Sequence, residues 1–373
     1  MFFHVIVTTE CPLECRYCFG EALQDTGTGF PGFALDYSLP SRIAYDVATL
    51  DRFCRRDPEC VLILYGGEPL LDVATVKLIL DRVTAQHVLL QTNGVLLHTL
   101  EPAYVNRLHT ILVSLDGEEA VTDANRGPGT FRRTMDNLHR ITRNGYRGEL
   151  IARMTVMEPM DIDQQVRWLV ENEEFPFTAV HWQLNAGFWD DFPRRRFQAW
   201  SEANYMPGIR RLARYWVDWM EAQGTVLRLY PFLGVAHSLL FETSASLLRC
   251  GGGWINYAIQ TDGHLIPCPT MWGMKDFYVG HIRDADPTAL PRVLVGSPCL
   301  TCDLYPICGG RCLYANLTHR WGADAYRLVC ITVRHLVDAV TDELPRIRRL
   351  LRQGALRPQD FAFMKYNGCE IIP

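Results

Sequence analysis

Three cysteines at the end of an apolar N-terminal segment constrain this chain more than any other feature. Cys11, Cys15 and Cys18 follow one another with the spacing Cys-x3-Cys-x2-Cys. A cubane iron–sulfur cluster normally takes four thiolates, so three leave one iron open to another ligand. The alternative is a zinc site that a ligand from elsewhere in the chain completes. The N-terminal segment is therefore expected to end at a metal site.

Short β-rich runs after this triplet end in turns of glycine and polar residues. The run at residues 61–65 is followed by Gly66-Gly67-Glu68-Pro69, a turn at which the backbone must approach another group closely. The next two runs end at Thr92-Asn93-Gly94 and at Leu115-Asp116-Gly117. Polar strand ends of this kind are expected to share one edge of a sheet.

Strands and helices alternate through roughly the first 190 residues, which predicts an α/β fold with a parallel sheet and crossover helices. We expect strands at 5–8, 61–65, 87–91, 110–114, 150–156 and 179–184, and helices at 44–55, 73–84, 131–143 and 163–171. An eight-unit barrel needs about 250 residues, so six units favour a partial, open (β/α)6 barrel. Parallel α/β folds place their sites at the carboxyl ends of the strands, where the cysteines and turns fall.

These motifs together resemble the radical S-adenosylmethionine (SAM) superfamily. The resemblance implies that SAM chelates the open iron, that an electron from the cluster cleaves its sulfonium, and that the resulting 5′-deoxyadenosyl radical abstracts a hydrogen from the substrate. A guanidinium suits the SAM carboxylate because it presents a planar fork, and the resemblance gives this role to Arg126 together with Ser114. The residues expected to contact SAM are Tyr17, Gly66, Gly67, Glu68, Asn93, Ser114 and Arg126.

A second cysteine array begins at Cys250 and ends at Cys330. It continues through Cys268, Cys299, Cys302, Cys308 and Cys312. The local pattern Cys-x2-Cys-x5-Cys-x3-Cys also suits zinc, but the whole spacing resembles the SPASM domain, an auxiliary-cluster module of peptide-modifying radical SAM enzymes. Residues 255–260 and 264–267 predict a hairpin around an Asp-Gly turn that carries Cys268 toward a cluster.

The resemblance implies two auxiliary clusters. The outer one takes Cys299, Cys302, Cys308 and Cys330, and the inner one takes Cys250, Cys268 and Cys312. The inner set is one thiolate short, because residues 243–246 contain no cysteine where sulfatase-maturing relatives have one. Either another residue, with Cys369 as the leading candidate, completes the inner cluster, or one iron is open to substrate or water. Cys54 and Cys60 are expected to be buried or free thiols.

Pro269 directly follows Cys268, at the position where sulfatase maturases resemble this chain but carry an aspartate thought to act as a base. Proline cannot accept a proton. Sulfatase maturation is therefore disfavoured unless Asp276 or another carboxylate substitutes.

Composition fits a soluble cytoplasmic enzyme with two modest cores, since the 373 residues are 48% hydrophobic and carry a net charge of −5. No run is apolar enough to span a membrane, no room is left for a signal peptide, and no basic cluster suggests nucleic acid. Aromatic residues between 196 and 223 predict a core-facing helix, divided at Pro207; the alternative is that they wall a substrate channel between domains. Residues 227–246 are expected to be a connector. Residues 20–40 are expected either to cover the site or to form a surface excursion.

The expected domain divisions are a barrel at 1–190, a helical linker at 191–246, a SPASM domain at 247–335 and a C-terminal helix and tail at 336–373.

The sequence thus predicts a radical SAM enzyme that modifies a peptide or protein, with SAM, three [4Fe-4S] clusters and an external flavodoxin- or ferredoxin-type electron donor. The modification would be a crosslink, a thioether or an oxidation. A sulfatase-maturase-like enzyme and a small-molecule dehydrogenase of the same superfamily are alternatives within the enzyme class. An iron–sulfur or zinc scaffold or redox sensor is the non-enzymatic alternative, and it would have no use for Gly66, Gly67, Glu68 or Arg126. The catalytic acid or base is not identified by any motif.

Overall fold

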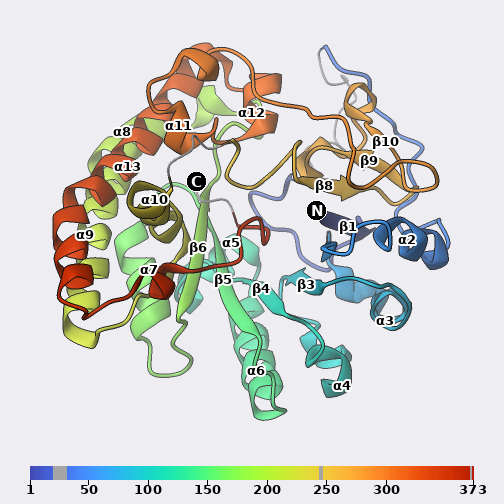
Figure 1. Ribbon diagram of the computed structural model, residues 1–373, viewed down its shortest axis with the longest axis horizontal. Helices are drawn as coiled ribbons and strands as arrows, with labels where there is room; N and C mark the ends of the chain where they lie inside the picture. Colours follow the sequence, from blue (N-terminus) through green and yellow to red (C-terminus); the bar gives the residue numbers. More distant parts are fainter. Residues whose placement is uncertain (20–31, 243–246, 370–371) are drawn as a thin grey trace.

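The computed structural model describes residues 1–19, 32–242, 247–369 and 372–373. One ten-stranded sheet organises these residues, in the order β10-β9-β8-β1-β2-β3-β4-β5-β6-β7, and it curls into a partial barrel (Figure 1). The strands are β1 Phe2–Thr8, β2 Val61–Gly66, β3 His87–Thr92, β4 Thr110–Ser114, β5 Glu149–Val156, β6 Ala179–Leu184, β7 Arg228–Leu229, β8 Asn256–Ile259, β9 His264–Ile266 and β10 Gly280–His281.

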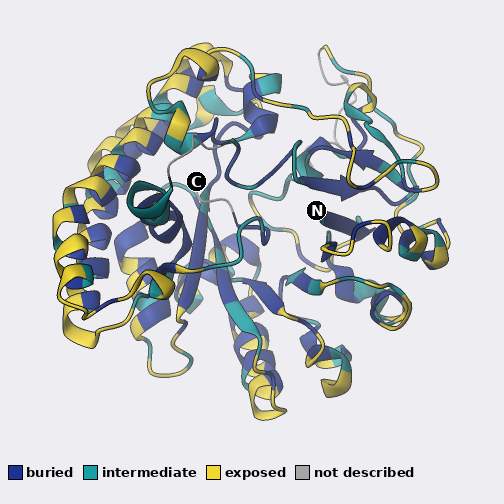
Figure 2. Cartoon of the chain, in the orientation of Figure 1, coloured by how far each residue is buried: buried dark blue, intermediate teal, exposed yellow. Residues whose placement is uncertain are grey.

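Every neighbouring pair from β1 to β7 is parallel, so the predicted α/β partial barrel is confirmed. Crossover helices cover the outside of the sheet, and their exposed faces form the outer surface (Figure 2). These helices are α2 Val47–Cys54, α3 Val73–Arg82, α4 Pro102–Val105, α5 Glu119–Arg126, α6 Thr130–Arg143 and α7 Ile162–Glu171. Each predicted strand and helix is present, with ends shifted by a few residues.

The predicted hairpin forms from β8 and β9, which pair antiparallel. The sequence did not indicate that β8 would also pair in parallel with β1, with Phe2 opposite Asn256. The cysteine-rich region therefore extends the barrel sheet, rather than standing apart from it. This pairing fixes the hairpin that precedes Cys268 directly beside β1.

Helices close the other side of the barrel. They are α8 Phe197–Trp200, α9 Met206–Gln223, α10 Tyr230–Phe241, α11 Tyr305–Cys308, α12 Leu313–Thr318 and α13 Gly322–Arg352. A π-helical turn at Ser201–Tyr205 joins α8 to α9. The helical backbone is therefore continuous from Phe197 to Gln223, and Pro207 does not divide it into two helices as expected. The aromatic stripe faces the core as expected, since Trp216 and Tyr205 are buried.

Two sequence expectations for the C-terminal half are corrected. Residues 227–246 are not simply a connector, because they contain β7 and the largely buried helix α10. The 335/336 division falls inside α13, a single 31-residue helix, so the backbone has no break there. None of the helices in the described ranges combines the length and the apolar character needed to cross a membrane.

The tail after α13 turns back into the barrel (Figure 1). Cys369 packs against inward-facing apolar residues of the strands, including Ile63, Leu89 and Leu112. Asn367 donates a hydrogen bond to the Tyr230 hydroxyl (3.0 Å). The tail therefore fills the lower barrel interior and closes the space above it from below.

Candidate active site

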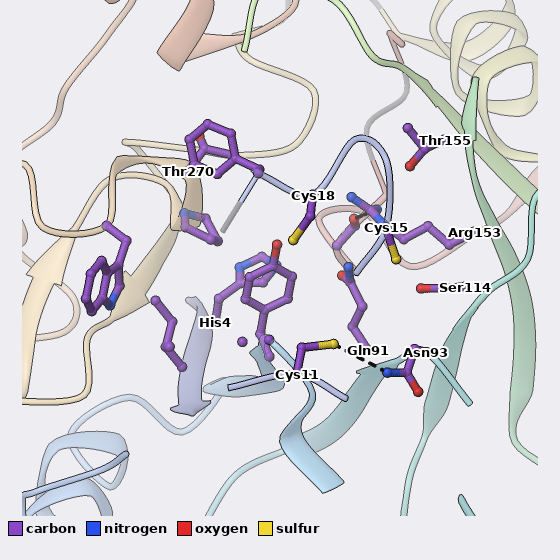
Figure 3. Close-up of a pocket in the computed structure, with 18 of the residues that line it drawn as sticks. His4, Cys11, Cys15, Cys18, Gln91, Asn93, Ser114, Arg153, Thr155 and Thr270 are labelled. Carbon is purple, nitrogen blue, oxygen red and sulfur yellow. Dashed lines mark hydrogen bonds between the residues drawn. The ribbon is translucent and has the colours of Figure 1, made fainter. Parts of the chain in front are cut away.

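A cavity of about 740 Å³ lies at the carboxyl ends of the strands, and residues far apart in the sequence line it (Figure 3). The barrel contributes nine of the residues singled out from the sequence: Cys11, Cys15, Tyr17, Cys18, Gly66, Gly67, Asn93, Ser114 and Arg126. Cys250 and Cys268 of the second array line the same cavity. The N-terminal cysteine triplet and two of the three inner-set cysteines thus line one cavity.

The glycine turn approaches the root of the cysteine loop. A Cβ atom added to Gly66 would lie 2.1 Å from the carbonyl oxygen of Thr8, and one added to Gly67 would lie 2.3 Å from that of Glu10. Gly66 also has a φ of 141°, which disfavours other residues. The close approach that the sequence predicted is therefore to the chain's own backbone, just before Cys11.

Glu68 is fully buried and is not among the residues that line the cavity. Its carboxylate accepts hydrogen bonds from the Asn93 backbone N–H (2.7 Å) and from the Thr92 hydroxyl (2.9 Å). Burial raises the pKa of Glu68 to about 7, against the lowering effect of these donors. The side chain thus ties the end of β2 to the end of β3, beneath the cavity wall.

Asn93 connects this turn to the cysteines. Its side-chain amide donates to the Cys11 sulfur at 3.7 Å. Burial raises the pKa of the Cys11 thiol to about 11, with the Glu68 and Cys15 charges adding to the effect. A bound cation or metal cluster would offset this shift, since a coordinating thiol is deprotonated outright.

Arg126 is engaged by a buried partner. Its guanidinium forks onto Asp116, with Nε–Oδ2 at 3.1 Å and Nη2–Oδ1 at 2.8 Å. Against the lowering effect of burial, the Asp116 carboxylate holds the pKa of Arg126 above its usual range. The Tyr17 hydroxyl also donates to Asp116, and the Tyr17 ring lies 5.3 Å from the Arg126 guanidinium. The Arg126 guanidinium, which was expected to bind the SAM carboxylate, is therefore already paired with the Asp116 carboxylate.

His4 and Asn256 form a polar pair in the cavity wall. The Asn256 amide nitrogen donates to the carbonyl oxygens of Cys250 (3.0 Å) and Tyr366 (3.4 Å), which leaves its Oδ1 facing His4 Nδ1 at 3.0 Å. Nδ1 must then be the donor, so in the neutral ring the lone pair lies on Nε2. His4 and Asn256 both line the cavity.

The cysteines expected to form the outer set influence one another electrostatically. Burial raises the pKa of Cys330 to about 11, and the nearby Cys299 and Cys302 thiols add to it. Burial raises the pKa of Cys308 to about 11 as well, with contributions from Cys330 and Cys299. Within the described ranges, no group of three or more His, Cys, Asp or Glu is arranged to hold a single metal ion.

The three inner cysteines meet at a second, smaller cavity of about 40 Å³, lined by Cys250, Cys268 and Cys312. Cys369 is not among its lining residues, because the tail places that thiol in the barrel interior, 1% exposed. The structure therefore does not bring Cys369 to the inner set, contrary to the leading sequence hypothesis. Cys54 and Cys60 are buried in the barrel core, as expected.

Asp276 lies outside the cavity. Its carboxylate accepts a hydrogen bond from the backbone N–H of Ala34 at 2.7 Å, and Leu35 forms a β-bridge with Met274. Residues 32–40 thus pack on the cysteine-rich region; residues 20–31 of the expected cover lie outside the described residues. Asp276 does not supply the base that Pro269 lacks.

Arg153 on β5 and His4 on β1 are among the cavity residues that sequence reasoning missed. Each is a polar residue within a strongly apolar strand of a parallel sheet. Such a residue is costly to bury without a partner, so it often marks a site. That signal was present in both strands.

Comparisons with known proteins agree with this geometry. Residues 5–169 match the model of the Radical SAM superfamily. An uncharacterized protein of Methanothermobacter thermautotrophicus is 28% identical over 183 residues, which cover 46% of this chain and 65% of that protein, less than two thirds of its length.

Two solved structures share the fold over most of the chain. One is anSMEcpe with bound AdoMet and the Cp18Cys peptide, with a TM-score of 0.67, 15% identity, and coverage of 94% of this chain and 99% of that one. The other is Streptococcus suis SuiB bound to its precursor peptide SuiA, with a TM-score of 0.53, 17% identity, and coverage of 86% and 74%. At these identities the likeness establishes the fold.

The glycine turn gives a testable prediction. Gly67→Ala should displace the backbone at Glu10, because the new Cβ would overlap its carbonyl oxygen. Hydrogen exchange followed by mass spectrometry should show faster exchange in residues 8–19. Gly296→Ala is the matched control, since nothing lies within 4 Å of its added Cβ. Equal exchange in Gly67→Ala and wild type would contradict the tight packing of this turn.

Proposed function

We infer that this chain, in which residues 5–169 form a radical SAM domain, is an enzyme. It would cleave SAM reductively and abstract hydrogen from a peptide or protein substrate. The observation that carries this inference is the single cavity lined by both the N-terminal triplet and two inner-set cysteines. A substrate in that space would contact the SAM site on one side and the second array on the other. The fold shared with anSMEcpe and SuiB, both solved with bound peptides, supports a peptide substrate.

The donor set fits the group that the family implies. Cys11, Cys15 and Cys18 line the cavity and would hold a [4Fe-4S] cluster with one iron that has no cysteine ligand. Asn93 would donate to the Cys11 sulfur, which stabilises a thiolate. When bound, SAM and the reduced cluster supply a 5′-deoxyadenosyl radical that abstracts a hydrogen atom.

The remaining cavity residues would bind and orient the substrate. His4, which lies in the cavity wall beside Asn256, would contact the substrate. Phe19, Phe188 and Trp272 line the cavity and would give the substrate apolar contacts. The two auxiliary clusters would take the outer and inner sets, and the fourth ligand of the inner one would be substrate or solvent. A flavodoxin- or ferredoxin-type protein would supply electrons.

Sulfatase-type maturation is the weaker alternative. It calls for a base directly after the second array cysteine, where Pro269 stands, and the Asp276 carboxylate is hydrogen-bonded to Ala34 outside the cavity. These observations favour another peptide modification, such as a crosslink, a thioether or an oxidation.

The proposal predicts SAM cleavage by the anaerobically reconstituted, dithionite-reduced protein. Chromatography should detect 5′-deoxyadenosine and methionine. Replacing Cys11, Cys15 and Cys18 together by Ala should abolish both products, because the cluster loses all its ligands. Cys54→Ala, which removes a buried thiol outside the cavity, should retain cleavage. Undiminished cleavage in the triple variant would refute the assignment.

Iron content tests the auxiliary clusters. Three cubane clusters require about 12 iron atoms per chain. Cys268→Ala should lose about four of them, whereas Cys369→Ala should lose none, because its thiol lies in the apolar barrel interior. Wild-type protein holding only about four irons, with zinc making up the remainder, would rule out the auxiliary clusters. A loss of about four irons in Cys369→Ala would restore that residue as a ligand.

A further inference from the structure

Arg249 is a buried cation beside the second cysteine array. It directly precedes Cys250 in the chain, and the residue is 6% exposed. The backbone here packs closely on the outer set, since a Cβ atom added to Gly309 would lie 2.0 Å from the carbonyl oxygen of Leu247. The segment that leads into the first inner cysteine therefore lies against the residue that follows Cys308.

One edge of the Arg249 guanidinium faces the outer set. Its Nε donates to the carbonyl oxygen of Ile307, the residue before Cys308, at 2.5 Å. Nη2 lies on the same edge as Nε, because the guanidinium is a rigid planar fork. Nη2 is shielded from solvent and has no hydrogen-bond partner among the described residues. Leaving a buried donor unpaired is costly, so this edge is suited to an acceptor beside Cys308.

The other edge of the guanidinium is anchored on α10. Nη1 donates to the Ser238 hydroxyl and lies 3.5 Å from a carboxylate oxygen of Glu242. The helices α10 and α11 contact each other (Figure 1), and Ile307 belongs to α11. Arg249 is therefore held between two helices, with its orientation fixed from both sides.

The positive charge of Arg249 is only partly balanced by its neighbours. Glu242 is the carboxylate that it contacts, and Lys365 of the tail pairs with the same carboxylate. Against the raising effect of burial, Lys365 and Ser238 lower the pKa of Glu242 to about 2, so Glu242 is ionised at neutral pH. His237, 3.4 Å from Glu242, adds charge only when it is protonated. Two cations thus share one carboxylate, which leaves positive charge beside the outer set.

The Cys308 sulfur is placed to carry negative charge. It accepts hydrogen bonds from the backbone N–H groups of Gly310 and Arg311. Burial lowers the pKa of Arg249, and the Glu242 carboxylate and the Cys308 sulfur oppose that shift. The cluster that the outer set would hold has four thiolate ligands, and its reduction adds one more negative charge. Net charge and hydrogen bonds to the sulfurs are what set the potential of such a cluster.

We propose that Arg249 raises the reduction potential of the outer auxiliary cluster, by placing a buried positive charge and an unpaired N–H donor beside Cys308. Arg249 would act through the cluster's surroundings, as a positioning residue and not as a ligand. The inference rests on the proposed function, because it takes a cluster held by Cys299, Cys302, Cys308 and Cys330. The cluster would accept one electron more readily than it would without this cation.

Redox titration of the reconstituted protein, followed by electron paramagnetic resonance, tests the proposal. In every protein compared, Cys11, Cys15 and Cys18 are replaced by Ala, so that the signals come from auxiliary clusters. Arg249→Gln should lower the midpoint potential of the outer cluster, because it removes the charge that stabilises the reduced form. We expect about a tenfold change in the one-electron equilibrium constant, which corresponds to about 59 mV. Arg249→Lys, which keeps the charge, should show a smaller shift.

Glu242→Gln separates an electrostatic role from a packing role. It removes the anion that partly neutralises Arg249, so it should raise the midpoint potential, and it also tests the proposal if Arg249→Gln loses the cluster. A purely structural role would shift the potential in the same direction in both variants. Arg327→Gln is the matched control, since Arg327 lies three residues before Cys330 but is exposed, where solvent screens its charge. It should leave the potential unchanged.

Cys268→Ala identifies the cluster that responds. It removes a ligand of the inner set, so the shift caused by Arg249→Gln should persist in its presence. An unchanged potential in Arg249→Gln, a shift that disappears with the inner cluster, or a lowered potential in Glu242→Gln would overturn the proposal. Wild-type protein with only about four irons per chain would instead refute the auxiliary clusters of the proposed function, and the inference with them.

Discussion

The buried carboxylate of Asp116 fixes the geometry on which the candidate site depends. It lies at the end of β4 and accepts hydrogen bonds from the cysteine loop through Tyr17, from α5 through Asn125 and Arg126, and from β5 through the Thr155 backbone. Breaking such a buried ion pair by removing one partner typically costs about 3–5 kcal/mol. The cysteine loop is therefore held by the barrel on the side away from the glycine turn, and Gly66 and Gly67 hold its root on the other.

The parallel pairing of β8 with β1 is the second constraint on the geometry of the candidate site. It continues the barrel sheet into the cysteine-rich hairpin, so Cys268 follows directly from a strand whose position the barrel sets. Asn256, the first residue of β8, links His4 of β1 to the backbone of Cys250 and Tyr366. One amide side chain thus joins β1, the backbone at Cys250 and the tail.

Local sequence signals predicted much of this arrangement. Apolar runs ending in Gly-Gly-Glu-Pro, Thr-Asn-Gly and Leu-Asp-Gly gave the strands and their polar ends, since strand and turn preferences are set within a few residues. The cysteine spacings gave the two arrays. What local signals could not give were the long-range pairings: β8 with β1, the tail inside the barrel, and the choice of Asp116 as the partner of Arg126. Each depends on segments that are 10 to more than 200 residues apart.

The most direct test of the account is electron–nuclear double resonance (ENDOR) of the reduced enzyme with isotopically labelled SAM. A cluster held by only Cys11, Cys15 and Cys18 leaves one iron for the amine and carboxylate of SAM. Spectra with ¹⁵N in the amine and ¹⁷O in the carboxylate should therefore show hyperfine coupling to both nuclei, and the triple cysteine variant should show neither. Wild-type enzyme with a reduced N-terminal cluster and no coupling to either label would contradict the account.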